Sequence, residues 1–294
     1  MKIDSMKKTT LKIFQFLIYL ILLEYAFIIK PSNAFIPTIN EPNKKELEST
    51  SIQIGRTALQ LIQFGQNNEA IKLLKLAVLL NPNEEDLWLT LAEAQVRSDK
   101  KYQALSSLNK AIKLNPKEQN TYFTKASIYM DLNNPKKAKI FITKGLSINK
   151  NSERGYFQLG NAEIMLNNYT LALIAFKKSS KINSNFWQSI NNEGLVFYEL
   201  NNPEEALSKF KSALKISNDP EPMLAVAVVL FSSDNNSLEA INLAKNALES
   251  NPLYVSQDYQ AKQLWGKKLQ KSAKLLLESK KLQKVVREAK EKSQ

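Results

Sequence analysis

The chain has 294 residues, contains no His and no Cys, and carries a formal net charge of +13. Without these two residue types it has no Ser-His-Asp or Cys-His mechanism, no disulfide and no ordinary zinc site. Only 7 Gly and 10 Pro are present, which leaves few of the residues that turns between strands need. An all-helical protein is the simplest interpretation.

The positive charge is concentrated at the two ends of the chain. Residues 1–34 carry a net charge of +3 and residues 258–294 carry +7, which leaves +3 for the body between them. A nucleic-acid-binding protein is expected to carry a basic stripe along its folded body. The sequence therefore predicts no nucleic-acid partner.

Residues 1–34 have the three parts of a secretory signal peptide. Basic residues precede an apolar run from Ile13 to Ile29, and Ser32-Asn33-Ala34 supplies the small residues that signal peptidase reads. The run is also at the lower limit for a membrane span, so an uncleaved single-pass anchor and a buried helix of a cytosolic protein remain alternatives. In the first two cases the rest of the chain is extracytoplasmic, in a periplasm or a thylakoid lumen, or is anchored to the membrane. We expect residues 35–50 to form a linker.

An alanine recurs every 34 residues through the middle of the chain, without insertion or deletion. These alanines are Ala70, Ala104, Ala138, Ala172, Ala206 and Ala240. Four positions later stand Leu74, Leu108, Ile142, Phe176, Phe210 and Ala244, a spacing typical of one helix face. A fixed period of this length indicates stacked copies of one unit. The sequence predicts six repeats, 51–84, 85–118, 119–152, 153–186, 187–220 and 221–254.

The first helix of each predicted repeat carries a matching pattern. The fourth position of this helix is aromatic in three copies: Trp88, Tyr122 and Tyr156. The eighth position is small in five copies: Ala58, Ala92, Ala126, Gly160 and Gly194. Small residues there let the paired helices approach closely. The sixth copy has Val228 at this position, so we expect looser or adjusted packing in it. Prolines that end the second helix follow in three copies, at Pro82, Pro116 and Pro252.

This order of residues in a 34-residue helix-turn-helix resembles the tetratricopeptide-repeat (TPR) family over residues 51–254. The resemblance implies an all-α solenoid, a right-handed superhelix whose first helices line a concave groove. Members of the family usually hold a peptide or a partner helix in that groove. The overall plan is also similar to membrane-tethered or exported TPR proteins of cyanobacteria and plastids.

By this resemblance, the residues of the first helices that face the groove are candidates for peptide binding: Leu89, Asn120, Phe123, Arg154, Phe157, Asn161, Asn191 and Asn192. Leu89, Phe123 and Phe157 occupy the same position in three consecutive repeats, which predicts an exposed apolar strip beside the amides. Such a strip fits an amphipathic or extended peptide. The alternative is that these residues pack against one another or against the linker.

One known binding mode of the family does not match this sequence. TPR co-chaperones that grip the acidic C-terminus of heat-shock proteins use a Lys and an Asn, then an Asn, then a Lys and an Arg. Here Phe157 replaces the first Lys, and Pro222 and Val226 replace the final basic pair. We therefore expect no carboxylate clamp.

Residues 255–294 lose the repeat signature but keep helical periodicity. We expect a capping helix over the last repeat, with these residues on its buried side: Ala261, Leu264, Trp265, Leu269, Ala273, Leu276 and Leu277. Beyond it, Leu282, Val285 and Val286 alternate with Lys and Arg. This basic tail is either a solvated, fraying helix end or a helix that lies on an anionic bilayer.

No motif for catalysis is present. The sequence has no Gly-rich phosphate loop, and paired acids such as Glu84 and Glu85 stand at predicted helix starts, where they complement the helix dipole. We therefore expect no enzyme activity, no cofactor and no metal site. The leading hypothesis is an exported or membrane-tethered interaction scaffold or assembly factor with protein or peptide partners. The alternative is an envelope-associated accessory subunit of a glycan- or lipid-handling complex.

Overall fold

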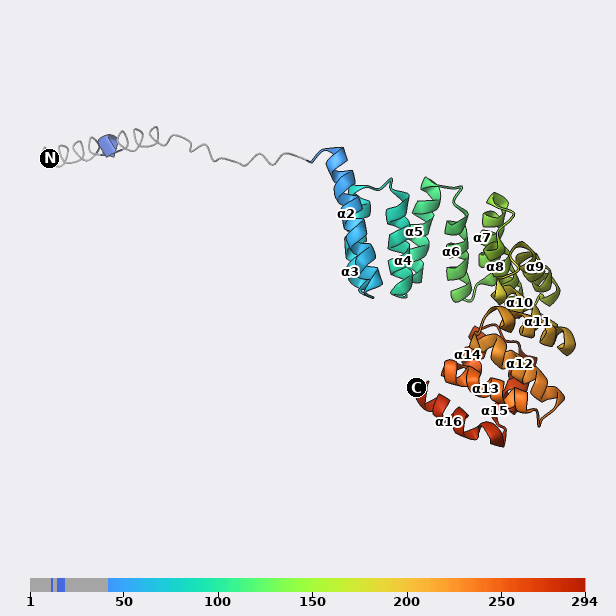
Figure 1. Ribbon diagram of the computed structural model, residues 1–294. Helices are drawn as coiled ribbons and strands as arrows, with labels where there is room; N and C mark the ends of the chain where they lie inside the picture. The colour runs from blue at the N-terminus through green and yellow to red at the C-terminus, as the bar shows by residue number, and fades with distance from the viewer. Residues whose placement is uncertain (1–11, 13–14, 19–41, 294) are drawn as a thin grey trace. The chain divides into compact units, whose positions relative to one another are not determined.

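The computed structural model describes residues 12, 15–18 and 42–293 (Figure 1). The chain divides into two compact units, Met1–Glu46 and Leu47–Gln294. In the first unit, residues 15–18 are helical. The signal peptide or anchor expected in residues 1–34, with its cleavage site after Ala34, lies almost wholly outside the described residues. Within those residues, no helix combines the length and the apolar character that a membrane span needs.

Every regular element in the described part of the chain is a helix, and the repeat array consists of six consecutive pairs. The pairs are α2 (Lys44–Gln63) with α3 (Asn67–Leu80), α4 (Glu85–Arg97) with α5 (Lys101–Leu114), α6 (Gln119–Asp131) with α7 (Pro135–Ile148), α8 (Glu153–Met165) with α9 (Tyr169–Ile182), α10 (Trp187–Glu199) with α11 (Pro203–Ile216), and α12 (Pro220–Ser233) with α13 (Leu238–Ser250). Four consecutive first helices, from α4 to α10, begin 34 residues apart, as the sequence predicts.

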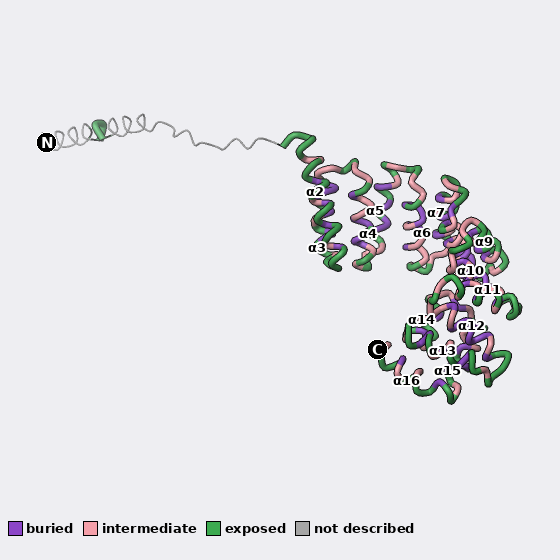
Figure 2. Tube along the Cα trace, in the orientation of Figure 1, coloured by how far each residue is buried: buried purple, intermediate pink, exposed green. Residues whose placement is uncertain are grey.

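The core lies along the seams between these helices (Figure 2). All six periodic alanines, from Ala70 to Ala240, are fully buried. Two pairs show the close approach: a Cβ on Gly160 of α8 would lie 2.4 Å from the Phe176 ring of α9, and a Cβ on Gly194 of α10 would lie 2.6 Å from the Phe210 ring of α11. The small residue on the first helix therefore makes room for the large residue on the second.

The sixth pair keeps the same packing with the sizes exchanged. Val228 of α12 and Ala244 of α13 stand where the fifth pair has Gly194 and Phe210, and both are fully buried. The larger residue of the two is therefore on the first helix in the sixth pair, whereas it is on the second helix in the fifth pair. The expected adjustment of the sixth copy is therefore a swap of large and small residues.

The turn between the two helices of a pair also repeats every 34 residues. In the first five pairs one turn residue has a positive φ: Gly65, Asp99, Asn133, Asn167 and Asn201. In the second pair, Lys100 N donates to Gln95 O at 2.7 Å and Asp99 N donates to Val96 O at 2.9 Å. This is a Schellman ending, which needs a left-handed residue, and Gly and Asn adopt that conformation most readily.

The linker expected over residues 35–50 ends earlier than predicted. Asn43 N donates to the Glu46 carboxylate at 3.1 Å, and Glu46 N donates to Asn43 Oδ1 at 3.0 Å. This reciprocal pair is a capping box, and it starts α2 at Lys44. The first helix is therefore 20 residues long and takes in residues 44–50 of the expected linker.

The C-terminal segment, residues 252–292, is folded and broken into short helices. These are η1 (Pro252–Val255), α14 (Gln257–Lys262), α15 (Lys267–Leu277), η2 (Lys280–Leu282) and α16 (Gln283–Lys292). The expected capping helix over the last repeat is α15, whose Leu269, Ala273 and Leu276 are buried in the same cluster as residues of α12. The segment is nevertheless broken, because the chain turns at Leu264, whose φ is +64°, and at Gly266. Ala261, which we expected on the buried side, is exposed.

The basic tail does not fray as one of our two alternatives supposed. Leu282 and Ala289 are buried against the last repeat, and Val285 and Val286 pack against the same cluster. The apolar side of the tail is thus already covered by protein. The side of the tail that faces solvent carries mostly Lys and Arg, with Gln283 and Glu291 among them.

Candidate functional site: the concave face

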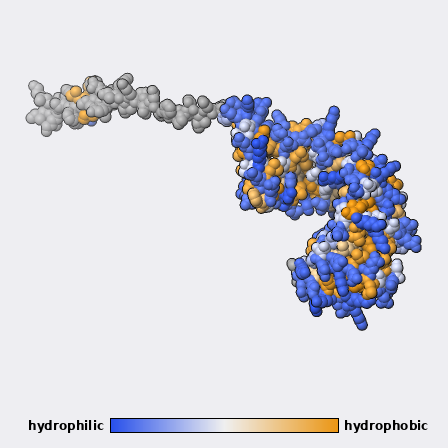
Figure 3. Space-filling model, viewed as in Figure 1, coloured by the Kyte–Doolittle hydropathy of each residue, from blue (hydrophilic) through white to orange (hydrophobic). Residues whose placement is uncertain are grey.

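The candidate site is the inner face of the repeat array, formed by the first helices of successive pairs. The array bends, and its surface shows hydrophobic areas between hydrophilic ones (Figures 1 and 3). Residues of α8, α10 and α12 line one pocket together with residues of α14. The C-terminal segment therefore lies across the first helices at this end of the face. Ala261, Lys262 and Leu264 of the segment also line a pocket of about 540 Å³ with Met130 and Asp131 of α6. We call the face at α8–α12 the covered half and the face at α2–α6 the open half.

In the covered half, three contacts fix the C-terminal segment. Trp265, which is 2% exposed, donates from Nε1 to Glu221 Oε1 of α12 at 3.1 Å. The hydroxyl of Tyr198 in α10 donates to Ser272 Oγ of α15 at 2.8 Å. The Glu199 carboxylate accepts hydrogen bonds from the first backbone amides of α15, including Leu269 N at 3.1 Å. A side chain of α10 thus caps a helix some 70 residues further along the chain.

The cap at α15 also explains a glycine. A Cβ on Gly266 would lie 2.2 Å from the carboxyl carbon of Glu199. Only a residue without a side chain lets the backbone come this close to the carboxylate. A side chain at position 266 would therefore push the Glu199 carboxylate from its present place at the start of α15.

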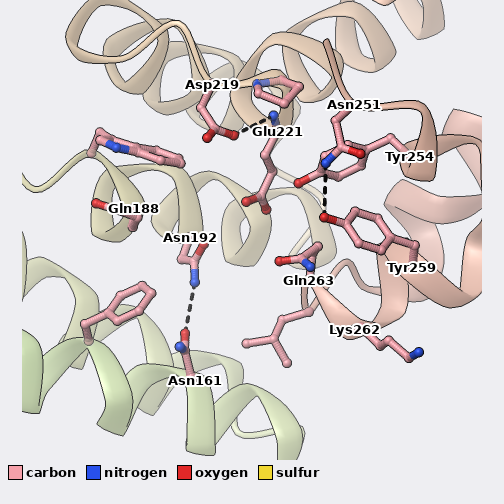
Figure 4. A pocket seen from close by; sticks show the side chains of 14 residues that line it. Asn161, Gln188, Asn192, Asp219, Glu221, Asn251, Tyr254, Tyr259, Lys262 and Gln263 are labelled. Carbon is pink, nitrogen blue, oxygen red and sulfur yellow. Dashed lines mark hydrogen bonds between the residues drawn. The ribbon is translucent and has the colours of Figure 1, made fainter. Parts of the chain in front are cut away.

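A pocket of about 470 Å³ remains beneath the segment (Figure 4). It is lined by Phe157, Asn161, Trp187, Gln188, Asn192, Asp219, Pro220, Glu221, Asn251, Tyr254, Tyr259, Lys262, Gln263 and Leu264. Figure 4 shows Asn192 directed at Asn161, and the bond from its Nδ2 to Asn161 Oδ1 is 2.9 Å. The Glu221 carboxylate points into the space between Asn192 and Gln263 (Figure 4). The lining is thus rich in amides and aromatic rings.

Glu221 is the most perturbed acid of this pocket. Burial raises its pKa to about 7, and the nearby Asp219 carboxylate acts in the same direction. Hydrogen bonds from Trp265, Asn191 and Tyr254 oppose the rise, because they favour the charged form. Since these donors fill its surroundings, Glu221 serves mainly to hold the C-terminal segment to α12.

The open half contains a larger cavity, which we call the slot. Its volume is about 800 Å³ and it lies between α4 and α6, with Leu108 of α5 also in its wall. The lining residues are Leu59, Asp86, Leu89, Thr90, Glu93, Val96, Arg97, Leu108, Glu118, Asn120, Thr121 and Thr124. A second pocket of about 440 Å³ follows along the face, lined by Arg154, Phe157, Gln158 and Asn161 among others. None of the C-terminal segment lines either cavity.

The structure distributes the predicted site residues over several places. Leu89 and Asn120 line the slot, whereas Arg154, Phe157 and Asn161 line the second pocket. Phe157 and Asn161 also line the covered pocket, together with Asn192, and Asn191 and Phe123 are fully buried. The single continuous strip that we expected therefore does not form.

The expected exposure of Phe123 is wrong, and the cause is a pair of glycines. A Cβ on Gly145 would lie 2.4 Å from the ring of Phe123, and a Cβ on Gly155 would lie 2.6 Å from it. The ring fills the space that these two residues leave open, so it turns into the core. Gly145 stands where other repeats have Ala77 and Ala111, and this departure was a visible signal in the sequence.

Sequence reasoning missed the residues that close the C-terminal half. Glu221 and Glu199 look like ordinary acids on helices, and Tyr254 and Tyr259 lie outside the repeat pattern. Only Trp265 and Gly266, standing side by side after the last repeat, were an indication that the chain turns back.

Comparisons with known proteins agree with this architecture. Residues 85–118 and 119–152 match the family model described as tetratricopeptide repeat. No curated protein sequence matches the chain. The chain is similar in fold to the MamA protein, with a TM-score of 0.52 and 21% identity over 58% of this chain and 92% of MamA.

Two further solved structures cover more of the chain. The pilF protein of Pseudomonas aeruginosa has a TM-score of 0.59 and 16% identity over 74% of this chain and 99% of its own. The APC/C hetero-tetramer Cut9-Hcn1 gives a TM-score of 0.59 and 16% identity over 76% of this chain and 46% of the other. At these identities the likeness concerns the fold alone. Together with the helix pairs and their 34-residue period, it shows that the chain has the tetratricopeptide-repeat fold.

Proposed function

We propose that the chain is a non-catalytic scaffold that holds a protein or peptide partner on the open half of its concave face. The observation that carries this proposal is the pair of cavities, about 800 and 440 Å³, whose linings contain first helices and no residue of the C-terminal segment. Exposed apolar side chains lie at the same place, with Leu59 42% exposed. A concave, partly apolar surface with a few polar groups is typical of a binding site.

The similar structures support this proposal only through the fold. Cut9 was solved as part of a hetero-tetramer with Hcn1, so one array of this fold takes part in a protein assembly. The same architecture serves many different partners, and fold alone does not name one. The partner of this chain has to be identified by experiment.

The test compares two leucine substitutions on opposite sides of the first repeat. Leu59→Asp places a charge at the slot, whereas Leu79→Asp places the same charge on α3, where the leucine is 75% exposed. The full-length chain and both variants are used to capture partners by chemical crosslinking and mass spectrometry. We expect a partner that the wild type and Leu79→Asp retain and Leu59→Asp loses. Equal recovery with all three proteins, or no recovery above background, would contradict the proposal.

We further propose that residues 1–34 export the chain or tether it to a membrane. The support is the order of basic, apolar and small residues in that segment. Intact-mass analysis of the protein from its native membrane fraction and its soluble fraction tests this. A chain that begins at Phe35 indicates a cleaved signal, and a membrane-bound chain that retains Met1 indicates an anchor. A chain that retains Met1 and stays in the cytosol would exclude both.

The second candidate function is an envelope-associated subunit that handles glycan. The specific observation in its favour is the covered pocket of about 470 Å³, where the rings of Phe157, Trp187 and Tyr259 stand beside several side-chain amides. Rings that stack on a sugar face and amides that bond its hydroxyls suit such a ligand. Copurification with cell-wall polymer that Trp187→Ala abolishes would favour this function over the scaffold. Unchanged copurification would exclude this pocket as the cause.

A further inference from the structure

The slot in the open half has an apolar interior and an acidic rim. Leu108 and Thr121 in its wall are 1% and 2% exposed, while Leu89 and Val96 are half-buried. The exposed residues at its mouth include Asp86, with Glu93, Arg97 and Asn120 beside it. A bulky apolar side chain that enters such a slot removes its own surface and that of the lining leucines from water.

The rim carries more negative than positive charge. Three carboxylates line the slot, those of Asp86, Glu93 and Glu118, against one cation, Arg97. Arg97 is already paired with Glu93, at 2.9 Å between Nη2 and Oε1. The surplus acids stand out on a chain whose net charge is +13. An incoming lysine or arginine is therefore attracted to this rim.

A buried polar atom in the same wall has no partner. The hydroxyl of Thr121 neither accepts nor donates a hydrogen bond among the described residues, although the residue is almost fully buried. A buried polar group without a partner is costly and calls for an explanation. An occupant of the slot offers one, because small movements of α6 would bring this hydroxyl to a backbone group of the occupant.

The covered half shows what this face accepts. Leu264 of the C-terminal segment packs against the cluster of Ile164 and Phe176, with Phe157 beside it. Two residues earlier, Lys262 lies in the same pocket lining as the acids Asp219 and Glu221. A bulky apolar side chain of the chain itself is thus already packed on this part of the array. Leu264 has a left-handed backbone, with a φ of +64°, because it stands at the Schellman ending of α14, where its N donates to Ala261 O and Trp265 N donates to Gln260 O, both at 3.0 Å.

We propose that the slot between α4 and α6 binds a partner segment that carries a bulky apolar side chain flanked by lysine or arginine. The apolar side chain fills the space between Leu89 and Leu108, and the basic side chain pairs with Asp86 at the rim, where Glu93 and Glu118 add to the negative charge. This inference rests on the proposed scaffold function and names the class of partner that the open half selects.

The test is a selection of random peptides about a dozen residues long, displayed on phage, on the immobilised full-length chain. Affinities of the enriched peptides are then measured by fluorescence anisotropy for wild type and three variants. Asp86→Lys with Glu93→Lys reverses the rim charge, and Thr124→Trp fills the slot without changing charge. Glu204→Lys with Glu205→Lys is the matched control, since both glutamates are exposed in the first turn of α11. Circular dichroism confirms that each variant is folded.

We expect enriched peptides that combine a bulky apolar residue with Lys or Arg, and a loss of affinity of about 10-fold or more in the rim and slot variants. The control should bind as the wild type does. The inference would be overturned if the enriched peptides were acidic, or if they bound the rim and slot variants as well as the wild type. Either result would still agree with a scaffold that binds its partner on another surface. Absence of any enriched peptide, together with no crosslinked partner, would instead count against the scaffold function itself.

Discussion

Both halves of the concave face are built from the first helices of repeats, at equivalent positions. One half is nevertheless covered by the C-terminal segment, and the other is open. In the covered half, Tyr198, Glu199 and Glu221 each bind a group of the C-terminal segment. In the open half, the corresponding surface holds the slot, lined by leucines and acids. The repeat pattern therefore sets the shape of the face, whereas a few individual side chains decide what lies on it.

Because of this difference, substitutions in the covered half should affect stability as core substitutions do, and substitutions in the open half should act as surface substitutions do. Removing an anchor of the C-terminal segment should cost as much as a core mutation. Changes at the slot should leave folding almost unaltered. Substitutions in each half test this difference in stability.

The largest effect is expected from Trp265→Ala. The indole is 2% exposed and packs with Leu269 and Tyr254, so its loss leaves a cavity and an unpaired Glu221. We expect the free energy of unfolding to fall by about 3 to 5 kcal/mol in urea titrations. Trypsin should also cut more readily after Lys262. The control is Leu275→Ala on α15, which is 59% exposed and should change stability by less than about 1 kcal/mol. Equal effects of the two variants would contradict the anchoring role.

The next effect is a dependence of stability on pH that arises at Glu221. Its pKa is raised from 4.5 to about 7, so between these values the folded chain binds more protons than the unfolded chain. Stability is therefore greatest below the unfolded pKa and falls as pH rises through 7, by up to about 3 kcal/mol. Asp219, Tyr254, Tyr259 and Lys262 also face this group.

The measurement is urea unfolding at pH 5, 6, 7 and 8 for wild type and Glu221→Gln. Glutamine keeps the size of the side chain and an acceptor for Trp265, but does not titrate in this range. The variant should be close to the wild type at pH 5 and more stable at pH 8. If both proteins show the same slope, Glu221 does not carry the pH dependence.

A smaller effect is expected from Glu199→Ala, which removes the cap of α15. Loss of a helix cap costs about 1 to 2 kcal/mol. Because the capped amides belong to Lys268 and Leu269, hydrogen exchange should speed up in α15 first. Glu204→Ala at the exposed start of α11 is the control and should leave α15 protected. Unchanged exchange in α15 with Glu199→Ala would show that the carboxylate does not hold the segment.

The repeats and the buried residues that pack each helix pair together were predictable, because each of these contacts lies within one 34-residue period. Ala138 is one example, since its burial follows from its spacing alone. Phe123 was not predictable from its position, because Leu89 and Phe157 share that position and remain partly exposed. The direction of its ring depends on Gly145 and Gly155, which lie on two other helices.

The covered half was less predictable, since its contacts join residues far apart in the sequence. Glu199 and Leu269 are 70 residues apart, and Glu221 and Trp265 are 44 residues apart. No period links them, and they meet only because the array bends. The residues chosen from the repeat positions do line cavities of the face in several cases, but the segment that covers Asn192 could not be foreseen.

The smallest effect is expected from Thr121→Val in the open half. Valine has nearly the shape of threonine and removes a buried hydroxyl that has no hydrogen-bond partner among the described residues. We expect the free energy of unfolding to stay within about 1 kcal/mol of the wild type or to rise slightly. Peptides selected on the slot should bind the variant more weakly if they use this hydroxyl.

The control for this prediction is Ser179→Ala, a buried hydroxyl that does have a partner. Ser179 is fully buried and donates from Oγ to the Glu153 carbonyl at 2.8 Å, so its loss leaves that acceptor without this bond. It should cost about 1 to 3 kcal/mol, more than Thr121→Val. Thr121→Val could instead prove the more destabilising of the two. The hydroxyl of Thr121 would then be bonded within the chain, and it would not be available to a partner segment in the slot.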